Sequence, residues 1–131
     1  MTRCQETASA LEQVTGKEAR TDIAVSEIET PKGLSDRSAW LGRVMRGTWS
    51  DADHDFTSWR ENALNAVTSL PDGAAVFTHF IAINAIVGLL KNDPRVIVFR
   101  PGHCSITSLS RNNDGSFRVA ELGDEAATNV L

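Results

Sequence analysis

The stretch AAVFTHFIAINAIVGLL, residues 74–90, is apolar almost throughout and carries a single histidine, His79. Its first part, residues 74–78, follows the turn Pro71-Asp72-Gly73 and has the length and composition of a buried strand. Its second part, residues 80–90, is too long for a strand and apolar on nearly every side, which indicates a buried helix. The stretch therefore predicts a strand that runs directly into a helix, with His79 at the junction.

Helices and strands alternate around this stretch. Apolar residues at helical spacing predict three further helices, from about Thr2 to Gly16, from Ser35 to about Gly47, and from Phe56 to Val67. Extended segments are predicted over residues 21–28, at RVIVF (95–99), and on both sides of the turn RNNDGSF (111–117). This order predicts one α/β domain over residues 1–131, a three-layer helix/sheet/helix fold with a mostly parallel sheet and a C-terminal hairpin. Ligands of such sheets bind beyond the carboxyl ends of the strands, where His79 is expected.

Composition narrows the classes of function. The chain has 131 residues and a net charge of −4, which argues against a general nucleic-acid binder. Its longest apolar run, residues 80–90, is too short to span a bilayer, and no signal peptide is evident. The two cysteines, Cys4 and Cys104, have neither metal-ligand spacing nor a disulfide framework. We therefore expect a cytoplasmic protein, with no nucleic-acid partner and no membrane partner.

Two clusters resemble metal sites and are better explained otherwise. Asp51, Asp53 and Asp55 alternate as in a calcium loop, but the loop's sixth position is Phe56 and its twelfth is Asn62. These acids are expected to cap the following helix. The pair His103-Cys104 has no second pair to complete a metal site, and His54 is expected in a solvated loop. No metal is predicted.

His79 has two explanations from the residues alone. A buried histidine is often a core residue satisfied by the main chain. Against this, a position at a strand-to-helix junction places the ring beside helix N–H groups that favour anions. A binding or catalytic role and a structural role are both open on this ground.

The order of motifs resembles that of the histidine phosphatase (phosphoglycerate mutase-like) superfamily. TRCQETASALEQ (2–13) is similar to the family's Ser-Pro-x-x-Arg-Ala/Cys-x-Glu/Gln-Thr-Ala element, and DIAVSEI (22–28) looks like its Leu-x-Glu strand. SWRENALNAVTSLPDGAAVFTHFIAINAIVGLL (58–90) is similar to its late helix and second-histidine motif. Residues 99–130 look like its closing hairpin and tail. The likeness covers nearly the whole chain in the family's order.

The resemblance implies phosphoryl transfer through a phosphohistidine on a small phosphorylated substrate. Matching positions would make Arg3 a phosphate-binding arginine and His79 the second histidine, which gives hydrogen bonds and positive charge to the phosphoryl group. Glu27 would protonate the leaving oxygen, with Glu29 as its rival because EIETP (27–31) departs from the family's glycine-rich version. THFIAIN (78–84) replaces the common Ser-His-Gly-Gly, which changes the substrate pocket. No organic cofactor is implied.

One element of the family is missing from residues 1–131. Its nucleophile lies in an Arg-His-Gly motif at the end of the first, central strand, whereas the histidines here lie in DHD, THF and GHC. We expect an N-terminally truncated domain whose full-length form hydrolyses phosphomonoesters, while this chain lacks that activity. Loss of a central strand would expose its neighbours, so the chain could also form a homodimer and serve as a dimerisation module. A non-catalytic module that binds phosphate or another anion is a further hypothesis.

Overall fold

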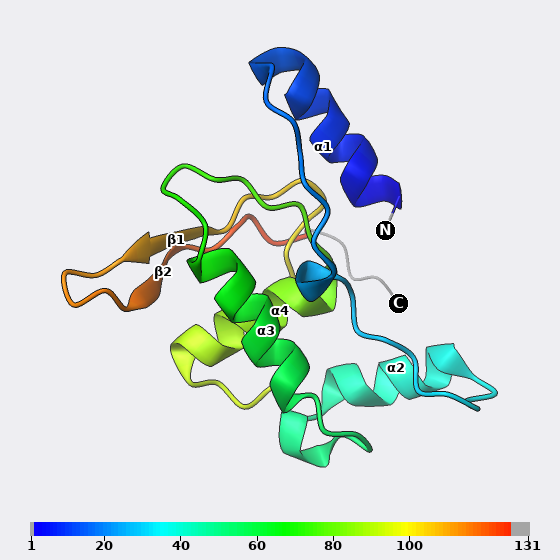
Figure 1. The fold of residues 1–131 in the computed structure, drawn as a ribbon. Coiled ribbons are helices and arrows are strands. Elements are labelled where there is room, and N and C mark those ends of the chain that lie inside the picture. The colour runs from blue at the N-terminus through cyan, green and yellow to red at the C-terminus, as the bar shows by residue number, and fades with distance from the viewer. Residues whose placement is uncertain (1, 127–131) are drawn as a thin grey trace.

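The computed structural model describes residues 2–126; Met1 and residues 127–131, the end of the predicted tail, lie outside the described part. The chain combines helices with a small antiparallel sheet (Figure 1). The elements, in chain order, are α1 (Thr2–Thr15), η1 (Ile23–Val25), α2 (Arg37–Arg46), η2 (Trp49–Asp51), α3 (Thr57–Thr68), α4 (Phe80–Lys91), β1 (Ser108–Arg111) and β2 (Phe117–Glu121). All four predicted α-helices are present.

Helix α4 is the centre of the molecule. Most of its residues are buried, as its apolar sequence predicts, and α3 packs across it (Figure 1). In Figure 1, α1 lies at the top and α2 at the lower right, with α3 and α4 between them and the hairpin projecting to the left. The buried core cluster consists of Ile28, Trp40, Val44, Trp49, Ile81, Ala85 and Val96. The core thus joins α2, η2 and α4 to two segments without regular structure.

An aromatic cluster closes the core on the side of α2 and α3. The ring of Phe56 lies 6.4 Å from Trp40, 6.0 Å from Trp49 and 6.3 Å from Trp59, in tilted or edge-on arrangements. The guanidinium of Arg60 lies over Trp49, 4.7 Å from its centroid. Such ring pairs add to the burial of apolar area, so this cluster fixes the start of α3 against α2.

The predicted C-terminal hairpin is confirmed. β1 and β2 pair antiparallel, with Leu109 opposite Val119 and Arg111 opposite Phe117. The connecting turn contains Gly115 at φ 85°, a left-handed conformation that glycine adopts without strain. Helix α4 packs against β2, so the hairpin covers one side of the central helix.

The predicted three-layer fold with a mostly parallel sheet is wrong for residues 2–126, whose single sheet is this two-stranded hairpin. Residues 21–28 contain the 3-10 helix η1 instead of a strand, and the predicted strands 74–78 and 95–99 join no ladder beyond the isolated bridge of Arg95 with Thr48. The reason is that a strand needs main-chain hydrogen bonds with a neighbouring strand, whereas main-chain groups of these segments bond to side chains instead. The side chain of Asn84, for example, accepts the main-chain N–H groups of Val98 (2.7 Å) and Phe99 (3.0 Å).

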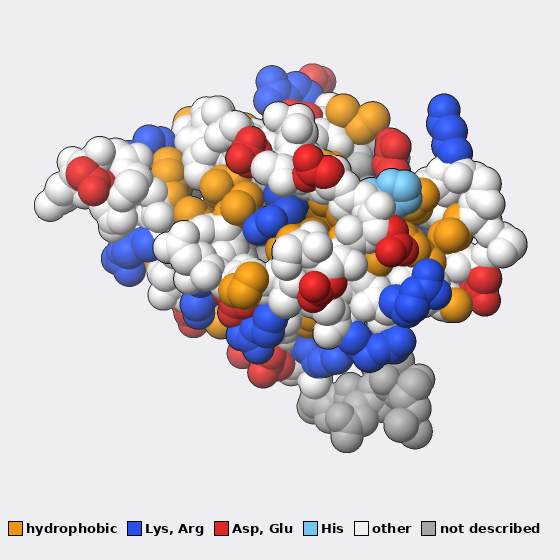
Figure 2. Space-filling view, turned by 90° about the horizontal axis from the view of Figure 1, so that it is seen from below, with side chains coloured by type: hydrophobic (Ala, Val, Ile, Leu, Met, Phe, Trp, Pro, Cys, Tyr) orange, Lys and Arg blue, Asp and Glu red, His pale blue; other side chains and the backbone are white. Residues whose placement is uncertain are grey.

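The surface carries charges of both signs. Figure 2 shows acidic and basic side chains interspersed over one face, with hydrophobic side chains between them. None of the helices within residues 2–126 is long and apolar enough to cross a membrane.

Candidate functional site

His79 occupies the N-cap position of α4. Its backbone is extended (φ −113°, ψ 167°), and its carbonyl accepts the N–H of Ile83 at 3.0 Å, so the helix begins directly after it. The side chain makes no capping hydrogen bond and is 9% exposed. The buried ring is therefore free of the capping role that a polar residue at this position usually has, and it faces another partner.

That partner is Cys4, in the first turn of α1. The Cys4 Sγ lies 3.6 Å from Nε2 and 3.9 Å from Nδ1 of His79, and it donates to the carbonyl of Thr78 at 3.4 Å. The hydroxyl of Thr78 in turn donates to the carbonyl of Val25 at 2.6 Å. These bonds bring α1, η1 and the segment before α4 together, although their sequences are far apart.

Glu27 caps the N-terminus of α4 from outside the helix. Its Oε2 accepts the N–H of Ile81 (3.1 Å), and its Oε1 accepts those of Ala82 (3.2 Å) and Ile28 (3.1 Å). The first N–H groups of a helix have no partner within it, and the helix dipole favours a negative charge there. The carboxylate of Glu27 thus occupies the anion position that the sequence pattern leaves open for a ligand beside His79.

Arg3 precedes Cys4 on α1, with an exposed side chain. Among the residues described, its guanidinium has no hydrogen bond or ion pair. Its charge nevertheless acts on His79, whose pKa is lowered from the ordinary 6.5 mainly by burial and further by Arg3, while Glu27 opposes the shift. At neutral pH the imidazole is therefore neutral, with one nitrogen able to accept a proton.

Of the three residues predicted to form the site, Glu27 and His79 lie together at the start of α4. Arg3 contributes only a small lowering of the pKa of His79, and among the described residues its guanidinium makes no hydrogen bond or ion pair with either. The position of Glu27 suits a helix cap better than a proton donor, because both of its oxygens accept N–H groups. Sequence reasoning missed the contact of Cys4 with His79. The only signal for it was the place of Cys4 in the first turn of a helix, directly after Arg3.

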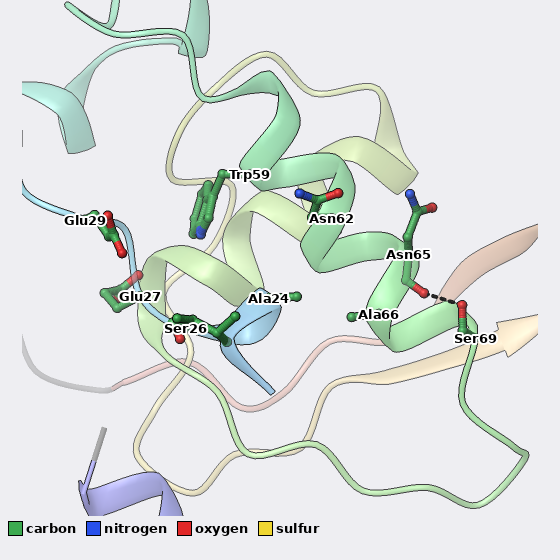
Figure 3. A pocket seen from close by; sticks show the side chains of 10 residues that line it. Ala24, Ser26, Glu27, Glu29, Trp59, Asn62, Asn65, Ala66 and Ser69 are labelled. Atoms are coloured by element: carbon green, nitrogen blue, oxygen red, sulfur yellow. Dashed lines mark hydrogen bonds between the residues drawn. The ribbon is translucent and has the colours of Figure 1, made fainter. Parts of the chain in front are cut away.

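A groove of about 580 Å³, which Glu27 also lines, opens between the η1 segment and α3. Figure 3 shows Glu27, Glu29 and Trp59 near one end of it and Asn65 and Ser69 at the other. The remaining lining residues are Ile23, Ala24, Ser26, Asn62 and Ala66. Glu29 is exposed and, within the described part of the chain, its carboxylate accepts no hydrogen bond. Glu29 is therefore the freer of the two candidate acids.

The other candidate residues lie elsewhere. Asp55 accepts the N–H of Thr57 at 2.8 Å at the start of α3, as a helix-capping acid does. His54, next to it, is exposed, and so are His103 and Cys104. No group of three or more His, Cys, Asp or Glu side chains within residues 2–126 is arranged to hold a metal ion.

Comparison with known proteins adds no relative: no protein-family model, curated protein or solved structure matches this chain.

Proposed function

We propose that this chain binds the phosphate group of a small phosphorylated molecule, or inorganic phosphate, between Arg3 and His79. The observation that carries the proposal is the docking of α1 on the start of α4, which brings the charge of Arg3 to bear on a buried histidine. A guanidinium can bind two phosphate oxygens at once, and an imidazole nitrogen can donate to a third.

Phosphate binding would change the protonation of His79. Burial keeps the imidazole neutral, with a smaller contribution from Arg3, whereas a bound dianion would favour the imidazolium and raise the pKa of His79. Binding of the dianion should therefore place a proton on His79, which the ring signals of His79 report directly. This protonation separates binding at His79 from binding by Arg3 alone, which leaves the imidazole neutral.

Glu27 limits the affinity of this site. It already holds the N–H groups of Ile81 and Ala82, so phosphate must rely on side chains, and its charge repels a second anion. Neutralising it by Glu27→Gln should strengthen phosphate binding by roughly tenfold, about 1.4 kcal/mol of removed repulsion. A proton donor in catalysis would show the opposite, a loss of activity.

Inorganic phosphate is the first ligand to test, at constant ionic strength and with the histidine ring signals followed by NMR. We expect a saturable shift of the His79 signal and at least about tenfold weaker binding in Arg3→Ala and in His79→Gln. His103→Gln, which changes an exposed histidine, is the matched control. Equal weakening by all three variants, or a shift that never saturates, would refute the proposal.

Hydrolysis of phosphomonoesters by a phosphohistidine mechanism is the activity that we propose for a longer form. The mechanism needs a nucleophilic histidine, which the family carries in an Arg-His-Gly motif that is not among residues 1–131. The other two histidines, His54 and His103, lie in different sequence contexts, DHD and GHC. In this scheme His79 and Arg3 hold the phosphoryl oxygens, and the freer Glu29 becomes a stronger candidate than Glu27 for the proton donor.

The assay is release of an aryl alcohol from an aryl phosphate. We expect no turnover by residues 1–131, and turnover by a form extended upstream in the reading frame that is lost on His79→Ala. Turnover by the 131-residue chain, abolished by the same substitution, would show that the missing nucleophile is the wrong explanation. If neither form turns over the aryl phosphate while phosphate binding is saturable, the result would favour the non-catalytic anion-binding module.

A further inference from the structure

We propose that Cys4 and His79 form a thiol–imidazole pair in which Cys4 is the nucleophile and hydroperoxides are its substrates. This activity does not depend on phosphate binding. The pairing rests on the 3.6 Å distance between the Cys4 Sγ and the His79 Nε2, which joins a nucleophilic atom to a base.

The base is available for proton transfer. The His79 ring is 9% exposed, and in the described structure Cys4 is its only hydrogen-bond partner. Burial lowers its pKa, so at neutral pH the imidazole is neutral and has a free lone pair. The nearby negative charge of Glu27 favours the imidazolium that forms when the thiol proton is transferred, in the way that a third group supports a catalytic pair.

The sulfur is both placed and reachable. The carbonyl of Thr78, at 3.4 Å, holds Sγ in position, and the Cys4 residue is half-buried. Cys4 lies in the first turn of α1 and next to Arg3 in the sequence, where the helix dipole and a guanidinium supply positive potential. These are the surroundings in which reactive cysteines are found, whereas inert structural cysteines are buried among apolar groups.

The reaction with hydrogen peroxide balances with these groups alone. The thiol proton passes to an imidazole nitrogen of His79, and the thiolate attacks one peroxide oxygen. The S–O bond forms as the O–O bond breaks, and the leaving hydroxide takes the proton from His79 to become water. The thiol is oxidised to sulfenic acid and the peroxide is reduced to water. A product at Cys4 would be a polar group against His79, at the start of α4.

Cys104 supplies a control within the same chain. It is exposed in the turn after Gly102, at φ 59°, and within the described residues it contacts no base and makes no hydrogen bond. Accessibility alone therefore predicts that Cys104 reacts faster than Cys4. Activation by His79 predicts the reverse, so the order of the two rates decides between the explanations.

The experiment treats the 131-residue protein with hydrogen peroxide at pH 7, traps sulfenic acid with dimedone and measures labelling of each cysteine by mass spectrometry. We expect Cys4 to react about tenfold faster than Cys104 in the folded protein and at a similar rate in urea. His79→Gln should remove the preference, while His103→Gln, next to Cys104, should leave it intact.

Two results would overturn the proposal: a Cys4 rate equal to or below that of Cys104 in the folded protein, or a Cys4 preference that survives His79→Gln. Circular dichroism shows whether His79→Gln is folded. If it is not, the ratio of rates in the folded and urea-unfolded parent decides, because accessibility alone cannot make the half-buried cysteine the faster one.

Discussion

Removing the carboxylate of Glu27 should destabilise the whole fold through α4. In Glu27→Ala the N–H groups of Ile81 and Ala82, which begin the central helix, lose their acceptor, and so does that of Ile28. Loss of a helix cap lowers the free energy of unfolding by about 0.5–2 kcal/mol, and loss of a negative charge at the N-terminus by a further 0.3–1 kcal/mol or so. We expect a decrease of about 2 kcal/mol for Glu27→Ala and of about 1 kcal/mol for Glu27→Gln, which keeps one acceptor oxygen.

The measurement is urea unfolding followed by tryptophan fluorescence, since Trp40 and Trp49 are buried in the core. With a typical slope for a domain of this size, about 2 kcal/mol moves the midpoint by roughly 1 M. Glu29→Ala is the matched control, because Glu29 lies two positions away, is exposed and caps no helix among the described residues. If Glu27→Ala and Glu29→Ala unfold at the same midpoint, the three N–H contacts do not stabilise α4 and the capping argument fails.

The remaining predictions concern the core, the titration of His79 and one helix. Asn84→Leu should lower the free energy of unfolding by about 3 kcal/mol in urea titrations, because the buried N–H of Phe99 and the half-buried N–H of Val98 lose their acceptor; a loss below about 1 kcal/mol would contradict this. By NMR, the pKa of His79 should lie below 6.5, lower still in Glu27→Gln and higher in Arg3→Ala; shifts in the reverse directions would refute the electrostatics. Because this pKa is depressed on folding, the parent should lose stability as the pH falls below about 6.5, and His79→Gln should lose less. Gly42→Ala lies inside α2, where a Cβ would meet only the Arg46 side chain at 3.5 Å, and it should raise the free energy of unfolding by about 0.5–1 kcal/mol and with it the thermal midpoint. An unchanged or lower midpoint would contradict this.

The helices could be predicted because their signals are local. The apolar face of α3, the apolar sequence of α4 and the acidic residue Asp55 at the start of α3 all lie within or next to the elements they specify. The hairpin was equally local, since the turn at Gly115 sets the pairing of β1 with β2. The predicted parallel strands needed non-local partners instead. A short apolar segment such as residues 74–78 has the same sequence pattern whether it pairs in a sheet or lies unpaired against a helix.

The candidate site shows the same division between local and non-local information. The place of His79 directly before α4 followed from the change of pattern within one stretch. The role of Glu27 did not, because a helix cap supplied from residues far away in the sequence has no local signature. The approach of Cys4 to His79 also depends on how α1 docks, which the sequence of α1 alone does not specify.

The three extended segments are held by particular side chains, and this bears on how the sequence can vary. In a sheet the main chain pairs with the main chain, so many different side chains preserve the same register. Here Glu27 ties its own segment to the first N–H groups of α4, at residues 81–82. Thr78 ties the segment before α4 to residue 25, and Asn84 of α4 holds residues 98–99. Substitutions at Glu27, Thr78 and Asn84 should therefore be poorly tolerated, because each would shift a whole segment. Most other polar positions in this part of the chain should accept substitution freely.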